Sequence, residues 1–185
     1  MLTEISLNIL DVTENSTKAG ATLVKLTVSA DTARDRLVVV IDDNGCGMDE
    51  EQVKRVVDPF YTTRKTRRVG LGVPFFKMSA EVTGGSFDIK SRVGEGTVVT
   101  AEFVLSSIDR MPMGDLASTV HQLITQHPDT DFLFSYSVDG RGFTLDTVEM
   151  REILGGIPLQ SPEVSEYLRD YLKENILETN GKTLI

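Results

Sequence analysis

The sequence predicts an α+β fold in which helices pack on a sheet of mostly antiparallel strands, and three patterns predict it. Residues 4–18 carry apolar side chains at helical spacing, including Ile5, Ile9 and Val12. Pairs of strand patterns follow one another across short turns, as antiparallel neighbours do. An amphipathic helix, a hairpin and two more helices repeat this mixture beyond residue 115. The strand patterns of the first part are 23–29, 37–41, 86–91 and 97–105.

The remaining elements of the first part follow from local signals. The almost continuous apolar run 37–41 is typical of a strand that is buried on both faces. A short helix is predicted over 49–57. Pro74 is tolerated only in the first turn of a helix, so the next helix is predicted over 72–83, ending at the glycine pair 84–85.

A second region begins after residue 107, where the composition shifts and Met111-Pro112-Met113-Gly114 marks a break. Residues 106–185 carry 13 acidic against six basic side chains and hold most of the net charge of −9. Apolar spacing predicts a helix from Leu116, a hairpin over 132–145, and helices from Asp146 and from Ser161. We therefore expect two units: residues 1–107, and a small acidic α+β region at 108–185 that regulates the first or binds a protein partner.

Composition excludes several function classes. No apolar run approaches the roughly 20 residues of a membrane span, so no membrane partner is expected. The basic residues cluster only at Arg64, Lys65, Arg67 and Arg68, which is too little for duplex binding, so no nucleic-acid partner is expected. A lone cysteine, Cys46, and the lack of a signal-peptide pattern predict a cytoplasmic protein.

The first motif with chemistry is Asp43-Asn44-Gly45-Cys46-Gly47-Met48, directly after the strand at 37–41. A carboxylate at the end of a strand can accept a hydrogen bond from the exocyclic amine of a purine. The glycines let the backbone approach a ring without an intervening Cβ. A plain turn between strand and helix is the alternative interpretation of the same residues.

The second motif, Val69-Gly70-Leu71-Gly72, opens the helix at 72–83 and follows the basic loop. Free amides at a helix N-terminus, together with nearby positive charge, favour an anion such as triphosphate. A flexible turn with solvated basic side chains is the alternative. The loop 61–69 is polar and lacks apolar periodicity, so we expect it to be mobile until phosphates bind.

The third motif is a polar stripe on the first helix. Its members recur three or four residues apart, which places them on one face. An amide oxygen suits octahedral Mg²⁺, a carboxylate one turn earlier can orient or deprotonate a nucleophile, and a lysine can pair with phosphate. The alternative interpretation is a solvated helix face that binds no ligand. The stripe consists of Glu4, Asn8, Asp11, Asn15 and Lys18.

Together the motifs resemble the GHKL family of ATP-binding domains, which includes histidine kinases, gyrase, heat-shock chaperones and mismatch-repair ATPases. Residues 11–21 resemble the family's asparagine box, 43–47 its first glycine box and 59–64 its phenylalanine box. Gly70-Leu71-Gly72 resembles the second glycine box, and the glycines from 84 to 96 with Thr97 resemble the closing strands. The resemblance implies a Bergerat-type two-layer α/β sandwich, with helices on one face of a mixed, mostly antiparallel sheet. It ends near residue 108.

The resemblance also implies roles for individual residues, with ATP and Mg²⁺ as cofactors. Asp43 binds the adenine amine, Gly45, Gly47 and Met48 line the base, and Thr97 assists through water. Asn15 holds Mg²⁺, and Lys18 contacts phosphate. Gly70, Leu71 and Gly72 give the phosphates their amides, and Thr62, Thr63 and Arg64 anchor the lid. Glu4 and Asn8 offer a rival pair for the metal, but only Asn15 precedes the Ala-Gly that the box expects.

Two departures from the family limit the functional prediction. The usual strand and helix before the asparagine box are missing from these 185 residues, so the sheet lacks an edge strand or borrows one. No phosphoacceptor histidine precedes the motifs, which argues against autophosphorylation in cis. His121 and His127 are interpreted as surface residues of a helix.

Asp11 stands where hydrolysing members and anti-sigma kinases have glutamate, so it is the predicted catalytic acid or base. It is one methylene shorter than glutamate, and a misplacement of about 1 Å can cost roughly a hundredfold in rate. The leading hypothesis is therefore an ATP–Mg²⁺-binding protein that acts as a slow ATPase or a nucleotide-dependent switch. A serine or histidine protein kinase acting in trans and a non-catalytic interaction protein with a vestigial pocket are the alternatives.

Overall fold

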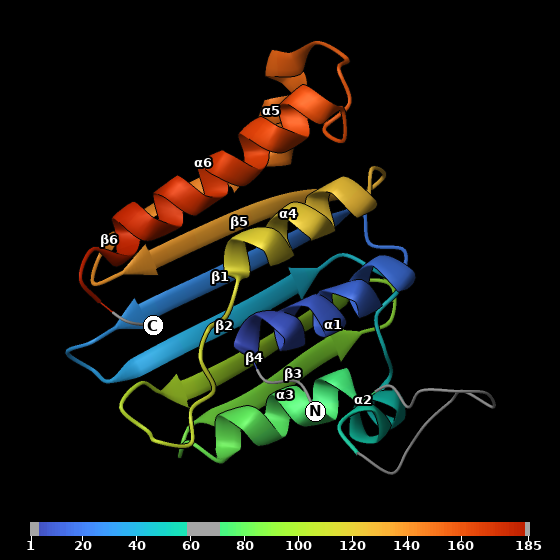
Figure 1. Ribbon diagram of the computed structural model, residues 1–185. Helices are drawn as coiled ribbons and strands as arrows, with labels where there is room; N and C mark the ends of the chain where they lie inside the picture. Colours follow the sequence, from blue (N-terminus) through green and yellow to red (C-terminus); the bar gives the residue numbers. More distant parts are fainter. Residues whose placement is uncertain (1–3, 59–70, 184–185) are drawn as a thin grey trace.

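The computed structural model describes residues 4–58 and 71–183 (Figure 1). Each helix and strand expected from the sequence in these ranges is present, with ends that shift by a few residues. The first part contains α1 (Ile5–Lys18), β1 (Leu23–Asp31), β2 (Arg36–Asp43), α2 (Glu50–Val56), α3 (Gly72–Glu81), β3 (Ser86–Arg92) and β4 (Gly96–Val104). The second contains α4 (Leu116–Gln126), β5 (Asp131–Val138), β6 (Arg141–Asp146), α5 (Thr147–Leu154) and α6 (Pro162–Asn180).

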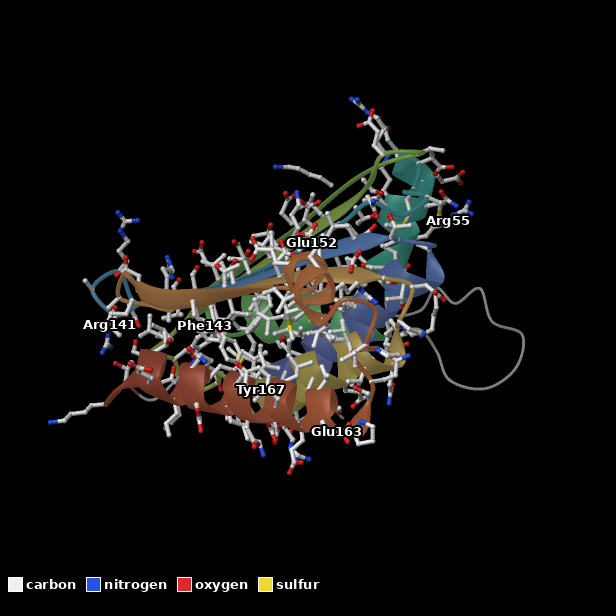
Figure 2. The ribbon with its side chains drawn as sticks, turned by 90° about the horizontal axis from the view of Figure 1, so that it is seen from above. Arg55, Arg141, Phe143, Glu152, Glu163 and Tyr167 are labelled. Carbon is white, nitrogen blue, oxygen red and sulfur yellow. The ribbon has the colours of Figure 1, made fainter. Side chains whose placement is uncertain are left out.

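The strands form one six-stranded sheet in the order β3-β4-β2-β1-β5-β6. β1 and β5 run parallel, and the other neighbouring pairs are antiparallel. Helices α1, α3, α4 and α6 cover the same face, and the view from above in Figure 2 shows the two layers edge-on. This arrangement is the predicted two-layer α+β sandwich with a mixed, mostly antiparallel sheet.

One expectation about β2 is wrong. Its residues alternate between buried and partly exposed, with Leu37, Val39 and Ile41 toward the helices and Val38 and Val40 on the other face. In the described part of the chain, helices cover one face of this sheet, so an apolar run does not imply burial on both sides. The alternation also turns Asp43 toward the helix layer, whereas Asp42 faces away from it.

The missing edge strand is borrowed from the second region. β5 lies beside β1 in parallel over Leu23–Ala30 and 131–138, which covers the edge that β1 would otherwise expose. Buried apolar residues from both regions belong to one core cluster, for example Ile9, Leu26, Phe103 and Phe134. The boundary at residue 107 therefore runs through a continuous sheet, and independent folding of the two units stays a prediction.

The connecting segment is also packed against the first helix. Pro112 O accepts a hydrogen bond from the backbone N–H of Ile5 at 3.0 Å, and Met113 O accepts one from Ser6 at 2.9 Å. These amides belong to the first turn of α1, where they have no acceptor within the helix, and no side chain among the described residues caps this end. The break predicted at 111–114 therefore holds the N-terminus of α1 in place.

Candidate functional site

Asp43 is the buried acid at the end of β2, and its side chain is 8% exposed. Ser16 on α1 donates its hydroxyl to Asp43 Oδ2 at 2.6 Å, and the backbone N–H of Gly45 donates to Oδ1 at 2.9 Å. One bond to each oxygen fixes the orientation of the carboxylate and leaves each oxygen a further lone pair. Asp43 is thus a preoriented acceptor between the sheet and the helix layer.

The loop after Asp43 packs too closely to accept side chains at its glycines. Gly47 has a φ of +66°, and a Cβ there would lie 1.9 Å from the carbonyl oxygen of Arg92. A Cβ on Gly45 would lie 3.0 Å from Ala19 Cβ and from Asp43 Oδ1. Gly47 is therefore needed where the loop packs on the β3–β4 turn, and Gly45 sits in a tight contact with the end of α1 and with Asp43.

The hydroxyl of Ser91 links Thr97 to Met48 near Asp43. Thr97 lies opposite Asp43 in the register of β2 and β4. Ser91 on β3 has its hydroxyl 2.8 Å from Thr97 Oγ1, and it accepts a hydrogen bond from the Met48 N–H at 2.8 Å. The predicted purine-binding residues Asp43, Gly45, Gly47, Met48 and Thr97 are therefore brought together in the structure.

Helix α1 lines the other side of the site with two of its predicted residues. Asp11 and Asn15 are exposed one turn apart, and a Cβ on Gly72 would lie 2.9 Å from Asp11 Cβ. The catalytic candidate therefore faces the first residue of α3. Among the described residues no group of three or more His, Cys, Asp and Glu could hold a metal ion. Asn15 as the Mg²⁺ ligand, which the family resemblance implies, stays a prediction.

The predicted stripe on α1 is wrong at Asn8, which is fully buried. Its Nδ2 contacts the carbonyl oxygen of Glu4 at 3.4 Å, and its Oδ1 has no partner in the described chain. The helix rotates Asn8 toward the core because it lies beside the apolar positions Ile5, Ile9 and Val12. The burial of Asn8 therefore argues against the rival metal pair of Glu4 and Asn8.

The N-terminus of α3 carries the second glycine motif. Leu71 is the N-cap and Gly72 the first helical residue, and no side chain caps this end among the described residues. Uncapped first-turn amides can donate to an anion. The predicted residues Thr62, Thr63, Arg64 and Gly70, together with the expected mobility of 61–69, lie outside the described residues.

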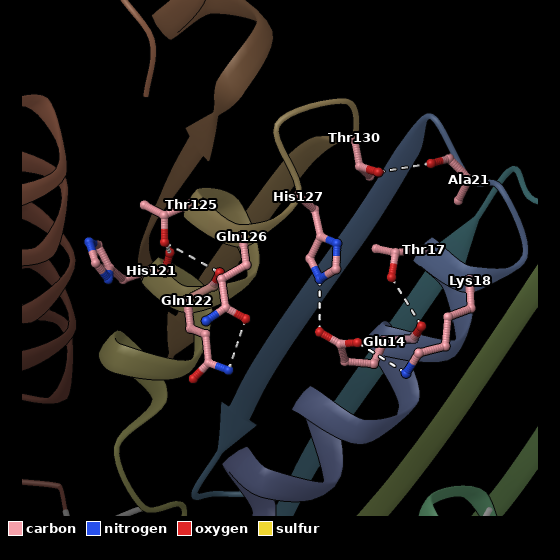
Figure 3. Close-up of polar contacts among 10 residues, drawn as sticks. All are labelled: Glu14, Thr17, Lys18, Ala21, His121, Gln122, Thr125, Gln126, His127 and Thr130. Carbon is pink, nitrogen blue, oxygen red and sulfur yellow. Dashed lines mark hydrogen bonds and ion pairs between the residues drawn. The ribbon is translucent and has the colours of Figure 1, made fainter. Parts of the chain in front are cut away.

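Lys18 joins an ion-pair chain at the end of α1 (Figure 3). Its Nζ lies 3.1 Å from Glu14 Oε2, and Glu14 Oε1 contacts His127 Nε2 at 2.8 Å. Burial alone raises the pKa of Glu14, but hydrogen bonds and charges from His127 and Lys18 outweigh it and hold the pKa below its ordinary value. Lys18 itself is half-exposed, with its ammonium group turned toward Glu14.

Sequence reasoning missed Ser16 and Ser91, which hold the site together. Ser16 continues the buried face of α1 that starts with Ile5, Ile9 and Val12, so a hydroxyl at this position needs a partner. That pattern could have indicated a buried polar contact. Nothing local predicts Ser91, because its partners Met48 and Thr97 meet it only through strand pairing and the loop.

Comparisons with known proteins agree with this geometry. The model of the family described as histidine kinase-, DNA gyrase B-, and HSP90-like ATPase matches residues 1–107. A putative sensor protein of Shewanella frigidimarina (strain NCIMB 400) is 33% identical over 85 residues, 45% of this chain and 13% of that protein. Sensor protein SrrB of Staphylococcus aureus (strain NCTC 8325 / PS 47) is 32% identical over 99 residues, 51% of this chain and 16% of that protein.

The chain belongs to this GHKL family of ATPase domains, because the family model covers more than half of it. It spans only a small part of the sensor proteins that it matches. The crystal structure of the N-terminal domain of a DNA repair protein shares the fold, with a TM-score of 0.54 at 12% identity over 78% of this chain and 52% of that one. None of the described helices has the length and apolar character needed to cross a membrane.

Proposed function

We propose that the protein binds ATP together with Mg²⁺ and acts as a slow ATPase or a nucleotide-dependent regulatory switch. The observation that carries this proposal is the Asp43 carboxylate, held by Ser16 and Gly45 with lone pairs left over. A preoriented acceptor of this kind selects an exocyclic amine, which adenine has at the matching position. Backbone at Gly45, Gly47 and Met48 lines the base, and Thr97 assists through water.

In this proposal the triphosphate lies over the exposed side of α1, next to the start of α3. Asn15 is exposed there, and its amide oxygen is a ligand that Mg²⁺ accepts beside phosphate oxygens. The metal neutralises phosphate charge. Leu71 and Gly72, with Gly70, donate backbone amides, and Lys18 leaves Glu14 to contact phosphate. Thr62, Thr63 and Arg64 complete the site as lid residues.

Asp11 is the proposed catalytic residue for either class of activity. It is exposed beside Gly72, where a carboxylate can activate water or the hydroxyl of another protein. A protein kinase acting in trans is the second candidate, because the family whose model matches is described as histidine kinase-like. We place the protein in the cytoplasm, and we assign contact with a protein partner to residues 108–185.

Calorimetric titration with Mg-ATP and with Mg-GTP tests the adenine assignment. We expect ATP to bind more tightly, and Asp43→Asn to weaken ATP binding about ten- to a hundredfold, the equivalent of about 1.5–3 kcal/mol. Asp42→Asn is the matched control, since the neighbouring carboxylate faces the other side of the sheet and pairs with Lys25 at 3.4 Å. Equal binding of both nucleotides by the wild type would refute the assignment.

Hydrolysis assays on wild type and Asp11→Asn test the activity class. The substitution keeps the shape of the side chain, so we expect nucleotide affinity to persist while turnover disappears. Equal hydrolysis by the two proteins would show that Asp11 is not the base. Transfer of labelled phosphate to a protein in cell extract, present with wild type and absent with Asp11→Asn, identifies the kinase instead of the switch.

A further inference from the structure

Exposed apolar side chains lie on α5, on α6 and on the loop that joins them. Among the described residues, Val148, Ile153, Ile157 and Tyr167 are large hydrophobic side chains exposed within a stretch of 20 residues. Ile153 is 85% exposed and Tyr167 is 64% exposed. Single exposed apolar residues are ordinary, but a gathering of them on adjacent helices marks an interaction surface.

Two of these side chains, Ile153 and Tyr167, line a groove between β6, α5 and α6. Its volume is about 430 Å³, and Leu145, Met150, Ile153, Leu154, Tyr167 and Tyr171 contribute most of its apolar wall. Figure 2 labels Tyr167 and Glu163 on α6 and Glu152 on α5 around this part of the molecule. The tyrosine rings lie next to each other, with centroids 6.2 Å apart. The groove is large enough for one or two apolar side chains of a partner.

The rim of the groove is acidic. Asp146, Glu149 and Glu163 line it, and an adjoining hollow of about 440 Å³ continues along α6 past Glu166, Asp170 and Glu174. Neither hollow is lined by a lysine or arginine within the described chain. Arg169 reaches Glu166 and Asp170 only at 3.9 and 3.8 Å. Arg169 thus offsets part of the charge along the adjoining hollow, and the groove itself combines an apolar floor with three carboxylates at its rim.

We propose that this groove docks a basic amphipathic segment of another protein. Large apolar side chains of the segment enter between α5 and α6, and its lysines or arginines lie along the carboxylates of α6. Opposite charge at the rim accelerates and orients such an encounter, and the paired tyrosine rings add cation–π attraction. A second copy of this chain would oppose the same carboxylates with like charge, which disfavours a symmetric dimer through this face.

The proposal goes beyond nucleotide binding and does not rest on it. β6 forms one end of the sheet, and β1 and β5 separate it from β2, which carries Asp43. No residue that lines the groove belongs to the proposed nucleotide site. Failure of either proposal therefore leaves the other standing.

Fluorescence anisotropy on the full chain tests the proposal with a labelled peptide about as long as α6, with leucine and lysine at helical spacing. We expect saturable binding that weakens as salt is raised. Ile153→Asn should weaken it about tenfold by removing an apolar contact, and the double variant Glu149→Gln, Glu163→Gln about fivefold. All three positions lie on the surface wall or rim of the groove, so folding should persist, which circular dichroism checks.

Two variants on α6 serve as matched controls. Leu177→Ser removes an apolar side chain that is also exposed, and Glu178→Gln removes a carboxylate, and neither residue lines a hollow. Both should bind the peptide like wild type. Equal binding of a peptide with glutamate in place of lysine, or unchanged binding by the groove variants, would overturn the proposal. A dimer in sedimentation that Ile153→Asn disperses would assign the groove to a second copy instead.

Discussion

The two ends of the sheet use polar residues in opposite ways. Beside β2 and β4 the polar side chains are bonded to one another, as the buried Ser16 is to Asp43 and the partly buried Ser91 is to Thr97. Beside β5 and β6 the buried layer is aromatic, with Phe134, Tyr136 and Phe143 in contact, while carboxylates stand on the surface. Buried polar pairs are costly unless every member is satisfied, whereas surface charge costs little.

The difference indicates which kind of ligand each end of the sheet can select. A buried acceptor with fixed geometry recognises a particular small molecule, and an acidic apolar surface suits a segment of protein. The Tyr136 hydroxyl in the aromatic layer is paired inside the protein, because it donates to Asn180 Oδ1 at 2.5 Å. Burial raises the Tyr136 pKa to about 12. The following predictions test how far the two ends depend on each other.

Removing residues 108–185 should have the largest effect. The fragment 1–107 would lose β5 from the edge of β1, the helices α4 and α6, and the backbone acceptors of Pro112 and Met113 at α1. Natural domains are stable by only about 5–15 kcal/mol, so we expect the fragment to lack a cooperative urea transition and to aggregate. A fragment that unfolds cooperatively at the midpoint of the full chain would show that residue 107 is a true domain boundary.

Core truncations at opposite ends should have similar and somewhat smaller effects. Phe134→Ala on β5 and Phe103→Ala on β4 each empty a fully buried position, and each should lower the free energy of unfolding by about 3–5 kcal/mol. If one core unites the regions, both variants shift the same single transition followed by circular dichroism. Two transitions, each sensitive to only one variant, would contradict a common core.

Ser16→Ala should act on the nucleotide site with a moderate effect. It leaves Asp43 Oδ2 buried without its donor, which costs about 1–3 kcal/mol. We expect Mg-ATP affinity to fall about tenfold because the carboxylate is no longer held in place. Thr17→Ala is the control, since the Thr17 hydroxyl donates to Glu14 O at 3.0 Å and away from Asp43. Unchanged affinity in Ser16→Ala would show that Gly45 alone orients the acid.

The smallest effect concerns pH at the contact of α4 with α6. His121 Nε2 lies 2.8 Å from Ser165 Oγ, and burial, together with the charges of Arg169 and Lys173, lowers the His121 pKa below its ordinary 6.5. The unfolded chain therefore takes up this proton more readily than the folded chain does. The contribution of neutral His121 to the stability of the folded chain is therefore fully present above the pKa of the unfolded state. It is lost as the pH falls through the pKa of the folded state.

Urea titrations between about pH 7 and pH 5 should detect this loss as a shallow slope in stability. His121→Gln should flatten the slope, and His127→Gln, which keeps His121, should retain it. The chain has two histidines, so this pair of variants is complete. An identical slope in both variants would assign the proton uptake to carboxylates.

The outcome at α1 illustrates how much of the site can be predicted. Periodicity placed Asp11 and Asn15 correctly on the exposed face, because their positions depend only on the helix. The same stripe failed at Asn8, where the packing of α1 against its neighbours decided which edge is buried. Ser16 was visible as a polar residue on an apolar face, but its partner Asp43 lies 27 residues away and is reached only in the folded chain.

By itself the sequence determined the helices, the strands, the family and the positions of its motifs. Propensity and turn chemistry act over short stretches, and each motif is a short run of residues that can be recognised without the fold. Only the tertiary structure decided that β5 completes the edge of β1, that one face of β2 stays partly open, and that Ser91 joins Met48 to Thr97. These are contacts between distant segments, and local sequence does not specify which strands pair or which face the helices cover. The acidic groove between β6, α5 and α6 arises for the same physical reason, since its wall exists only once three separate elements have packed together.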